Sequence, residues 1–351
     1  MLLPAAQIRL RALAGFLLVL ALAASACSDA TTAPVRNTAP VSTGDTTPAA
    51  PLGTPSVSPP SVLAGATLWI DPSSTARATA NSWRATRPAD AAQLDKIAAQ
   101  PQAIWFGDWN TDIASDVAAA SRTITAAGAT PVFVAYNIPQ RDCGGLSGGN
   151  AVDAAGYQRW IDGFAAGLGG RPAAVVLEPD ALAGMDCLSA SGQQTRLALI
   201  AYAVRAFHAV GNVAVYLDAG HPGWQSPATM AARLAAADIA DAAGFSLNVS
   251  NFIADADNIG YGQAVSALVG NKHFIIDSGR NGVGGTADAQ WCNPAGRALG
   301  TRPTTHTGVD GLDAFLWIKP PGESDGACNG GPDAGVWWPD YALGLAQRAA
   351  Y

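Results

Sequence analysis

Carboxyl groups follow four apolar runs of the sequence, at the point where each run ends. Asp142 and Asp180 follow the first two runs, Asp218 ends the third, and Asp325 lies just beyond the fourth. An apolar, β-branched run is typical of a buried parallel strand, and α/β enzymes place their chemistry where such strands end. Several carboxyls that meet at one edge indicate glycoside hydrolysis, because the glycosidic oxygen must be protonated while negative charge stabilises the transition state.

This chemistry requires one carboxyl that keeps its proton near neutral pH, and a neighbouring carboxylate or an apolar pocket raises its pKa enough for that. Taken singly, an aspartate at a strand end is more often a helix cap or a loop anchor. Glu178, directly before Pro179, is interpreted as a structural hydrogen-bond acceptor, and Asp277 is expected to form an internal ion pair with Arg280. The sequence has no recognisable nucleophile elbow, no His-Glu-x-x-His motif and no phosphate-binding loop, so neither a cofactor nor a metal is expected.

Apolar runs alternate along the chain with alanine-rich amphipathic segments that must position these carboxyls. This alternation predicts an α/β fold with a parallel sheet and right-handed crossovers, and the number of strand candidates favours a barrel. The eight strand candidates are Thr67–Asp71, Ala103–Gly107, Thr130–Asn137, Ala173–Glu178, Val213–Asp218, Gly244–Asn248, His273–Asp277 and Asp313–Lys319. The helix candidates are Asp116–Ala127, Ala154–Leu168, Gln193–Val210, Pro227–Ala236 and Gly262–Val269.

The composition narrows the class of partner. The chain has 351 residues, 49% hydrophobic and 13% charged, with a net charge of −7 and no basic cluster. Nucleic acid is therefore excluded as a partner, and a neutral polymer or small molecule fits better. The ten tryptophans suit stacking on sugar rings as well as core packing.

The N-terminal part of the chain predicts export. Residues 1–27 resemble a signal peptide, with two arginines before a short apolar stretch and small residues before Cys27. Lipidation of Cys27, which would tether the protein to a membrane, and ordinary secretion both remain open. Residues 28–61, rich in Thr, Pro, Ala and Ser, predict a flexible linker, and residues 62–351 a single catalytic domain.

The cysteines agree with export. Without Cys27, four of the five cysteines remain, an even number that suits disulfides in an oxidising compartment. Four cysteines allow three pairings, and the sequence by itself does not choose among them. Their wide spacing argues against a metal site.

Seven segments together resemble glycoside hydrolase family 6, a family that contains cellulases. They are Tyr-Asn-Ile-Pro-Gln-Arg-Asp-Cys-Gly, Leu-Glu-Pro-Asp-Ala-Leu, Tyr-Leu-Asp-Ala-Gly-His-Pro-Gly-Trp, Asn-Val-Ser-Asn-Phe, Asp-Ser-Gly-Arg-Asn-Gly, Gln-Trp-Cys-Asn-Pro-Ala-Gly-Arg-Ala and Phe-Leu-Trp-Ile-Lys-Pro-Pro-Gly-Glu-Ser-Asp-Gly. The resemblance extends in the same order from about Leu68 to Ala346. It implies a distorted β/α barrel of about seven strands, so that one of the eight candidates lies outside it. It also implies hydrolysis of β-1,4-glucan with inversion.

The resemblance also implies roles for individual residues. Asp180 is expected to be the general acid. Asp142 is expected to raise the pKa of that acid and orient water, and Ser147 to hold the attacking water. Asp325 is expected to be the base and Asp218 a supporting carboxylate of the catalytic set. The sugar-binding positions implied are Tyr136, His221, Trp224, Asn248, Trp291, Lys319 and Glu323, and the disulfides implied are Cys143–Cys187 and Cys292–Cys328.

Loop lengths bear on how the enzyme attacks a chain. The stretches from Asn251 to Lys272 and from Cys292 to Asp325 leave little room for a roof over the cleft. We therefore expect an open cleft, internal cleavage of a glucan, and a monomer. Two alternatives remain, a processive cellobiohydrolase of the same family and a non-catalytic glucan-binding lipoprotein.

Overall fold

The computed structural model describes residues 62–149 and 153–351, and within them seven parallel strands form one curled sheet in the order β1 to β7. The strands are β1 (Ile104–Gly107), β2 (Val132–Tyr136), β3 (Ala173–Leu177), β4 (Val213–Asp218), β5 (Gly244–Leu247), β6 (His273–Asp277) and β7 (Leu312–Leu316). The eighth candidate, Thr67–Asp71, contributes only an isolated bridge between Leu68 and Thr130. The predicted signal peptide, the linker and Cys27 lie outside the described residues.

The two edges of the sheet approach each other without a regular ladder. The Ala103 N–H donates to Trp317 O at 3.0 Å, and the indole Nε1 of Trp105 donates to Ile318 O at 2.8 Å. Every neighbouring pair of strands is parallel, so the carboxyl ends of all seven lie on the same side of the curled sheet. The chain segments that leave these ends therefore converge, as in a β/α barrel.

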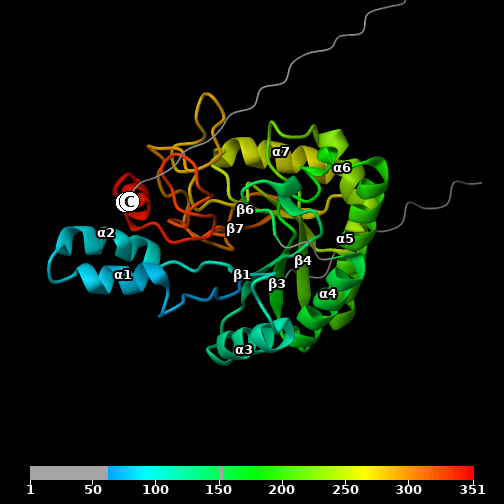
Figure 1. Cartoon of the computed structure of the whole chain (residues 1–351), viewed down its shortest axis with the longest axis horizontal. Coiled ribbons are helices and arrows are strands. Elements are labelled where there is room, and N and C mark those ends of the chain that lie inside the picture. Colours follow the sequence, from blue (N-terminus) through cyan, green and yellow to red (C-terminus); the bar gives the residue numbers. More distant parts are fainter. Residues whose placement is uncertain (1–61, 150–152) are drawn as a thin grey trace, which may run out of the picture. The chain divides into compact units, whose positions relative to one another are not determined.

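Helices α3 to α7 surround the sheet, whereas α1 and α2 lie to one side of it (Figure 1). Their bounds are α1 (Thr75–Trp83), α2 (Pro88–Ala98), α3 (Ile113–Ala126), α4 (Ala154–Leu168), α5 (Ala190–Val210), α6 (Pro227–Ala236), α7 (Asp255–Leu268) and α8 (Pro339–Gln347), with short 3₁₀ helices at Arg141–Gly144, Met185–Cys187 and Ile239–Asp241. The five predicted helices are present, although α7 begins seven residues earlier than expected. Helices α1, α2 and α8 were not predicted; they pack together in a separate apolar cluster.

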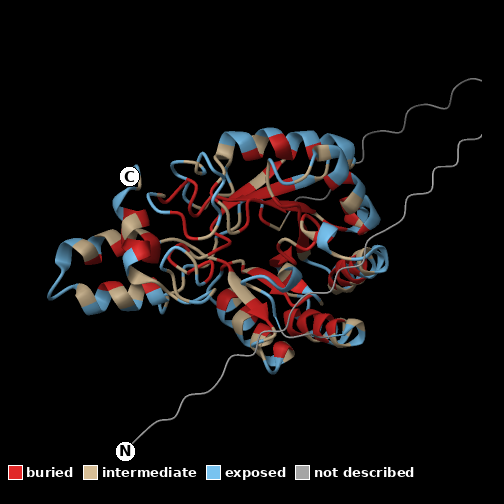
Figure 2. Ribbon diagram, turned by 45° about the horizontal axis from the view of Figure 1, so that its top comes forward, coloured by how far each residue is buried: buried red, intermediate tan, exposed pale blue. Residues whose placement is uncertain are grey.

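Two apolar layers hold the sheet. Side chains that point outward, such as Phe133, pack against Phe164 of α4, which in turn contacts Phe207 of α5. Side chains that point inward, such as Val134 and Val176, fill the inside of the curl. Figure 2 shows the result, with buried strands and with helices exposed only on their outer faces. Alternate residues of each strand thus serve opposite cores, which explains why the strands read as unbroken apolar runs.

Polar groups close the amino-terminal end of the sheet. The Tyr216 hydroxyl donates to Asp313 at 2.5 Å, and the same carboxylate lies 2.7 Å from Nδ1 of His273. This group lies at the end opposite the converging loops. No helix within residues 62–149 and 153–351 is both long and apolar enough to cross a membrane.

Candidate active site

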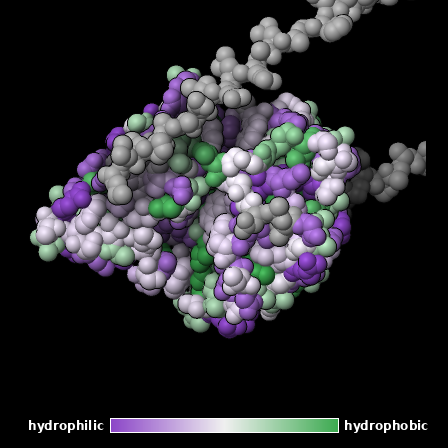
Figure 3. Space-filling view, viewed as in Figure 1, coloured by the Kyte–Doolittle hydropathy of each residue, from purple (hydrophilic) through white to green (hydrophobic). Residues whose placement is uncertain are grey.

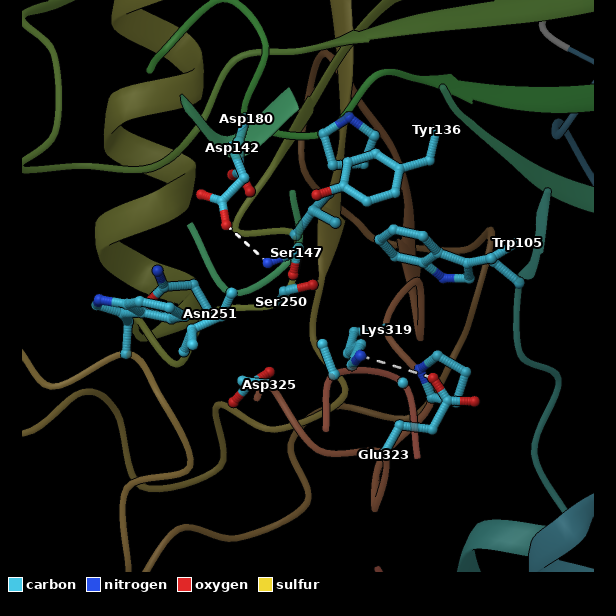
Figure 4. Close-up of a pocket in the computed structure, with 18 of the residues that line it drawn as sticks. Trp105, Tyr136, Asp142, Ser147, Asp180, Ser250, Asn251, Lys319, Glu323 and Asp325 are labelled. Atoms are coloured by element: carbon cyan, nitrogen blue, oxygen red, sulfur yellow. Dashed lines mark hydrogen bonds and ion pairs between the residues drawn. The ribbon is translucent and has the colours of Figure 1, made fainter. Parts of the chain in front are cut away.

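A cleft of about 1200 Å³ lies where the carboxyl ends of the strands converge. Figure 3 shows a depression on this face of the molecule with hydrophobic residues along its sides. Ten of the residues predicted from the sequence line the cleft, and Figure 4 shows several of them pointing into it. They are Tyr136, Asp142, Ser147, Asp180, His221, Trp224, Trp291, Lys319, Glu323 and Asp325.

Asp180 follows β3 and has the environment of an acid that keeps its proton. Burial raises the pKa of its carboxyl well above the ordinary value, and the negative charges of Asp218, Asp142 and Asp325 raise it further. The first cause disfavours the charged form in any buried site, while the others depend on where neighbouring carboxylates lie. This environment favours the protonated form of the Asp180 carboxyl, which lines the cleft.

Asp142 lies beside Asp180 on the loop that follows β2 (Figure 4). Its Oδ2 accepts a hydrogen bond from the backbone N–H of Ser147 at 2.8 Å. The disulfide between Cys143 and Cys187 ties this loop to the segment after Asp180. Ser147 thus contributes its backbone to the orientation of the Asp142 carboxylate, while the residue itself faces the cleft.

The backbone at these carboxyls adopts the left-handed conformation. The φ angles are 51° at Asp142, 49° at Cys143, 50° at Glu178 and 69° at Asp180. Residues other than glycine enter this region at a cost of about 1–2 kcal/mol. Such conformations persist where the surrounding structure imposes them, and they are concentrated at functional sites.

Asp218 supports Asp180 from beneath and does not line the cleft. Its Oδ1 accepts the N–H of Asp180 at 2.9 Å and that of Gly220 at 3.1 Å, and its Oδ2 accepts the Ser246 hydroxyl at 3.1 Å. Burial raises the pKa of Asp218 to about 7. The role of Asp218 as a supporting carboxylate remains a prediction. Because Asp218 does not line the cleft, it would have to act through Asp180.

Asp325 is held by a buried arginine. Nη1 of Arg280 lies 2.9 Å from the Asp325 carboxylate, and the N–H of Asn293 donates to the same group at 3.0 Å. The expected ion pair between Arg280 and Asp277 is therefore wrong. Asp277 instead accepts backbone N–H groups of Gly279, Ile318, Lys319 and Ser250 at 3.0–3.2 Å. The second disulfide, Cys292–Cys328, encloses this loop, as the resemblance implied.

The loops that carry Asp142 and Asp325 touch each other. A Cβ added to Gly326 would lie 2.7 Å from Cδ1 of Leu146, so the leucine side chain lies directly against the glycine backbone. Leu146 itself is exposed and lines the cleft. The contact joins the segment after β2 to the segment after β7.

One end of the cleft combines charge with an aromatic face. Nζ of Lys319 lies 3.6 Å from Glu323 and 5.8 Å from the ring of Trp105. Burial lowers the pKa of Lys319 and raises that of Glu323. The ring of Trp105 meets that of Tyr136 edge to face at 5.2 Å. Such a set can stack on one sugar and hydrogen-bond to its hydroxyls.

The other end of the cleft is aromatic as well. The rings of His221 and Trp224 lie 5.4 Å apart, and burial lowers the pKa of His221. Trp224 and Trp291 remain 39% and 48% exposed. Asn248 was expected to bind sugar, but it is buried outside the cleft lining. Its Nδ2 donates to Asp277 O at 2.8 Å, and its Oδ1 accepts the N–H of Ile253 at 3.1 Å.

Sequence reasoning missed many residues of the cleft lining, among them Trp105, Trp109, Ser250 and Asn251. Trp109 is 54% exposed. The two tryptophans flank the end of β1, so a tryptophan at a strand end was the signal that could have identified them. Ser250 and Asn251 lie in the segment Asn-Val-Ser-Asn-Phe, which resembles the family, but only Asn248 of that segment was assigned a role. Among the residues that the structure describes, no group of three or more His, Cys, Asp or Glu side chains is arranged to hold a metal ion.

Comparison with known proteins identifies the family. Endoglucanase A of Cellulomonas fimi is 47% identical over 273 residues, which cover 77% of this chain and 59% of that protein. A probable 1,4-beta-D-glucan cellobiohydrolase C of Aspergillus terreus is 34% identical over 64% of this chain and 61% of its own length. This chain thus spans about three fifths of the length of these relatives.

Solved structures agree with this assignment. The endoglucanase Cel6 from Mycobacterium tuberculosis, solved with methyl-cellobiosyl-4-deoxy-4-thio-beta-D-cellobioside, has a TM-score of 0.79 at 44% identity and covers 82% of this chain and 99% of that one. The sequence model of the glycosyl hydrolases family 6 matches residues 63–349. The chain therefore belongs to glycosyl hydrolases family 6.

Proposed function

We propose that this protein hydrolyses internal β-1,4-glucosidic bonds of cellulose or a related β-glucan, with inversion at the anomeric carbon. The observation that carries the proposal is the position of Asp180 in the lining of the cleft beside Asp142, where burial and neighbouring carboxylates raise the pKa of Asp180. Relatives named endoglucanase, at up to 47% identity, support the substrate class.

Asp180 acts as the general acid in this proposal and gives its proton to the glycosidic oxygen as the bond breaks. Asp142, oriented by the Ser147 N–H, keeps the pKa of the acid high and orients the attacking water. Asp325 is the assigned base; because Arg280 holds its carboxylate at 2.9 Å, it also places fixed negative charge near the developing cation. An inverting enzyme needs one carboxylic acid that protonates the leaving oxygen and a separate carboxylate that activates the attacking water.

Internal cleavage is supported by the exposed walls of the cleft. Trp224 and Trp291 remain open to solvent, so a long chain could enter from the side. A processive cellobiohydrolase is the second candidate, and the contact of Leu146 with Gly326 favours it, because a roofed enzyme needs loops that meet. The loss of viscosity of carboxymethylcellulose per reducing end released separates the two modes.

The test of the mechanism uses Asp180→Asn with Asp313→Asn as the matched control. Asp313 is a carboxylate at the opposite end of the sheet that also accepts side-chain hydrogen bonds. We expect Asp180→Asn to lower kcat on carboxymethylcellulose by at least about a thousandfold, somewhat more than the usual contribution of one acid, while the control keeps its activity. NMR of fresh product should show inverted configuration. Full activity of Asp180→Asn, or binding of glucan by the wild-type protein without any hydrolysis, would refute the assignment.

Export is a further part of the proposal. The two disulfides, Cys143–Cys187 and Cys292–Cys328, support it, because such bonds persist mainly in oxidising compartments. Mass spectrometry of the mature N-terminus distinguishes a lipidated Cys27 from an unmodified secreted protein.

A further inference from the structure

Two buried charged side chains, Glu178 and Arg196, lie behind the cleft without lining it. Glu178 is 1% exposed and Arg196 is 4% exposed. Burial of a charge costs free energy unless hydrogen bonds and opposite charge compensate for it. The contacts of Glu178 and Arg196 therefore show what compensates for the cost of their burial.

Glu178 connects the end of β3 to the loop that leads to Asp142. Its carboxylate accepts the N–H of Asn137 at 3.0 Å and that of Ile138 at 3.1 Å. Its own N–H donates to Ala135 O at 2.9 Å. Glu178 lies two residues before Asp180, so it fixes the chain that enters the acid against the chain that leaves β2.

Arg196 of α5 joins the same two segments from the other side. Its Nη1 donates to Ala181 O at 2.9 Å, directly after Asp180. Its Nη2 donates to Pro139 O at 2.9 Å and to Gln140 O at 3.0 Å, shortly before Asp142. One planar guanidinium thus donates to both loops. The several N–H groups of arginine suit this geometry better than the single ammonium group of lysine.

We infer that Glu178 and Arg196 form a clasp that sets the position of Asp142 relative to Asp180. Both are positioning residues, since neither reaches the cleft. The clasp holds Asp142 from its amino-terminal side, and the disulfide at Cys143 holds it from the other. Held from both sides, the loop keeps its left-handed conformation. The inference rests on the proposed function, because the clasp matters for catalysis only if Asp180 is the acid and Asp142 acts on it.

The clasp acts on the acid through charge. Asp142 is one of the carboxylates whose charge raises the pKa of Asp180, and this effect weakens as the two groups separate. A looser clasp should therefore lower the pKa of the acid. Glu178 itself faces Tyr157, Arg141 and Arg196, and burial raises its pKa to about 7.

The experiment compares Arg196→Met, Arg196→Lys, Glu178→Gln and Glu178→Ala with the wild-type protein, using cellotetraose across pH 4 to 9. We expect Arg196→Met and Glu178→Ala to lower kcat about tenfold, since a displacement of 1 Å can cost about a hundredfold. The alkaline limb of kcat should move about half a unit toward acid, a fraction of the one to three units that a nearby charge produces. Glu178→Gln and Arg196→Lys, which keep part of the hydrogen bonding, should show smaller effects, and KM should change less than twofold in every variant.

Asp313→Asn is the control for a purely structural effect, because it removes a partly buried, hydrogen-bonded carboxylate at the opposite end of the sheet. It should lower Tm without moving the alkaline limb. The inference is overturned if the clasp variants lose activity only in proportion to their folded fraction, with an unchanged pH profile. It is also overturned if KM carries the loss.

A second readout does not need turnover. A ¹³C NMR titration of aspartate carboxyls reports the pKa of Asp180 in the wild-type protein and in Arg196→Met. A lower pKa in the variant supports the clasp even if the wild-type protein hydrolyses no glucan, in which case the proposed function alone fails. An unchanged pKa refutes the clasp whatever the activity.

Discussion

Replacement of Asp218 by Asn removes one negative charge from beneath the acid and preserves the shape of the site. The retained carbonyl oxygen can still accept the N–H groups of Asp180 and Gly220, now at 2.9 and 3.1 Å. The new amide would face the hydroxyl of Ser246, which can rotate to accept from it. The change therefore isolates the charge.

The loss of this charge should lower the pKa of Asp180. A like charge in contact raises a carboxyl pKa by about one to three units, and Asp218 is the first of the neighbouring charges that act on Asp180. We expect the alkaline limb of kcat to move about one unit toward acid. One unit corresponds to about 1.4 kcal/mol, or a tenfold loss of kcat above the limb. The acid plateau should be unchanged, because Asp218 is protonated there.

The same replacement should change how stability depends on pH. Burial raises the pKa of Asp218 from 3.8 to about 7, so between these values the native state binds more protons than the unfolded state. Stability of the wild-type protein therefore falls as pH rises through this window, by about 4 kcal/mol from this group. Asparagine does not titrate. The free energy of unfolding of Asp218→Asn, relative to that of the wild-type protein, should therefore increase from pH 4 to pH 7.

Two measurements test this reasoning. Initial rates of cellotetraose hydrolysis from pH 4 to 9 give the limb, and urea unfolding at the same pH values gives the free energy of unfolding. Asp313→Asn serves again as the control and should leave the limb in place. A limb that stays at the wild-type pH would show that the charge of Asp218 does not act on Asp180. A stability difference that does not grow with pH would show that burial does not raise the pKa of Asp218.

Two further predictions concern the walls of the cleft. Trp105→Ala should raise KM for cellotetraose about tenfold, since a stacked aromatic contact contributes about 0.5–1.5 kcal/mol beyond its buried area; Trp105→Phe, measured in parallel, should recover most of the affinity, and an equal loss in both would contradict a stacking role. Gly326→Ala should displace Leu146, whose Cδ1 would lie 2.7 Å from the new Cβ, and should lower both Tm and kcat. Combination with Leu146→Ala should restore part of the loss, and strictly additive effects in this double-mutant cycle would show that the two loops are not coupled.

The strands were predictable because each is an apolar run that is buried on both faces. The same rule produced one error: Thr67–Asp71 has the pattern of a strand, yet only Leu68 pairs, with Thr130. Helix α7 begins at Asp255, in a polar stretch with little amphipathic pattern, so its first two turns depend on tertiary contacts. Helices α1, α2 and α8 are stabilised chiefly by one another, which no local pattern reveals.

The sequence motifs predicted many of the residues that lie in the site. They did not predict which side chains pair with each other through hydrogen bonds or ion pairs. Arg280 was assigned to Asp277, its neighbour in sequence. Backbone N–H groups occupy the Asp277 carboxylate, and Arg280 instead pairs with Asp325, which lies 45 residues away. Asn248 likewise looked like a ligand for sugar, but it links two loops inside the fold. Competition among several nearby acceptors is decided by three-dimensional packing alone.

The left-handed backbone at Asp142 and Asp180 sets thermal stability against activity when more stable variants of this protein are selected. Glycine, and to a lesser degree asparagine, adopts that conformation more readily, so substitutions at these positions would relieve strain and at the same time remove a carboxyl group of the cleft. A screen that rewards heat resistance alone should therefore enrich inactive proteins at these two positions. Libraries for thermal improvement should hold both aspartates constant and vary the helical exterior.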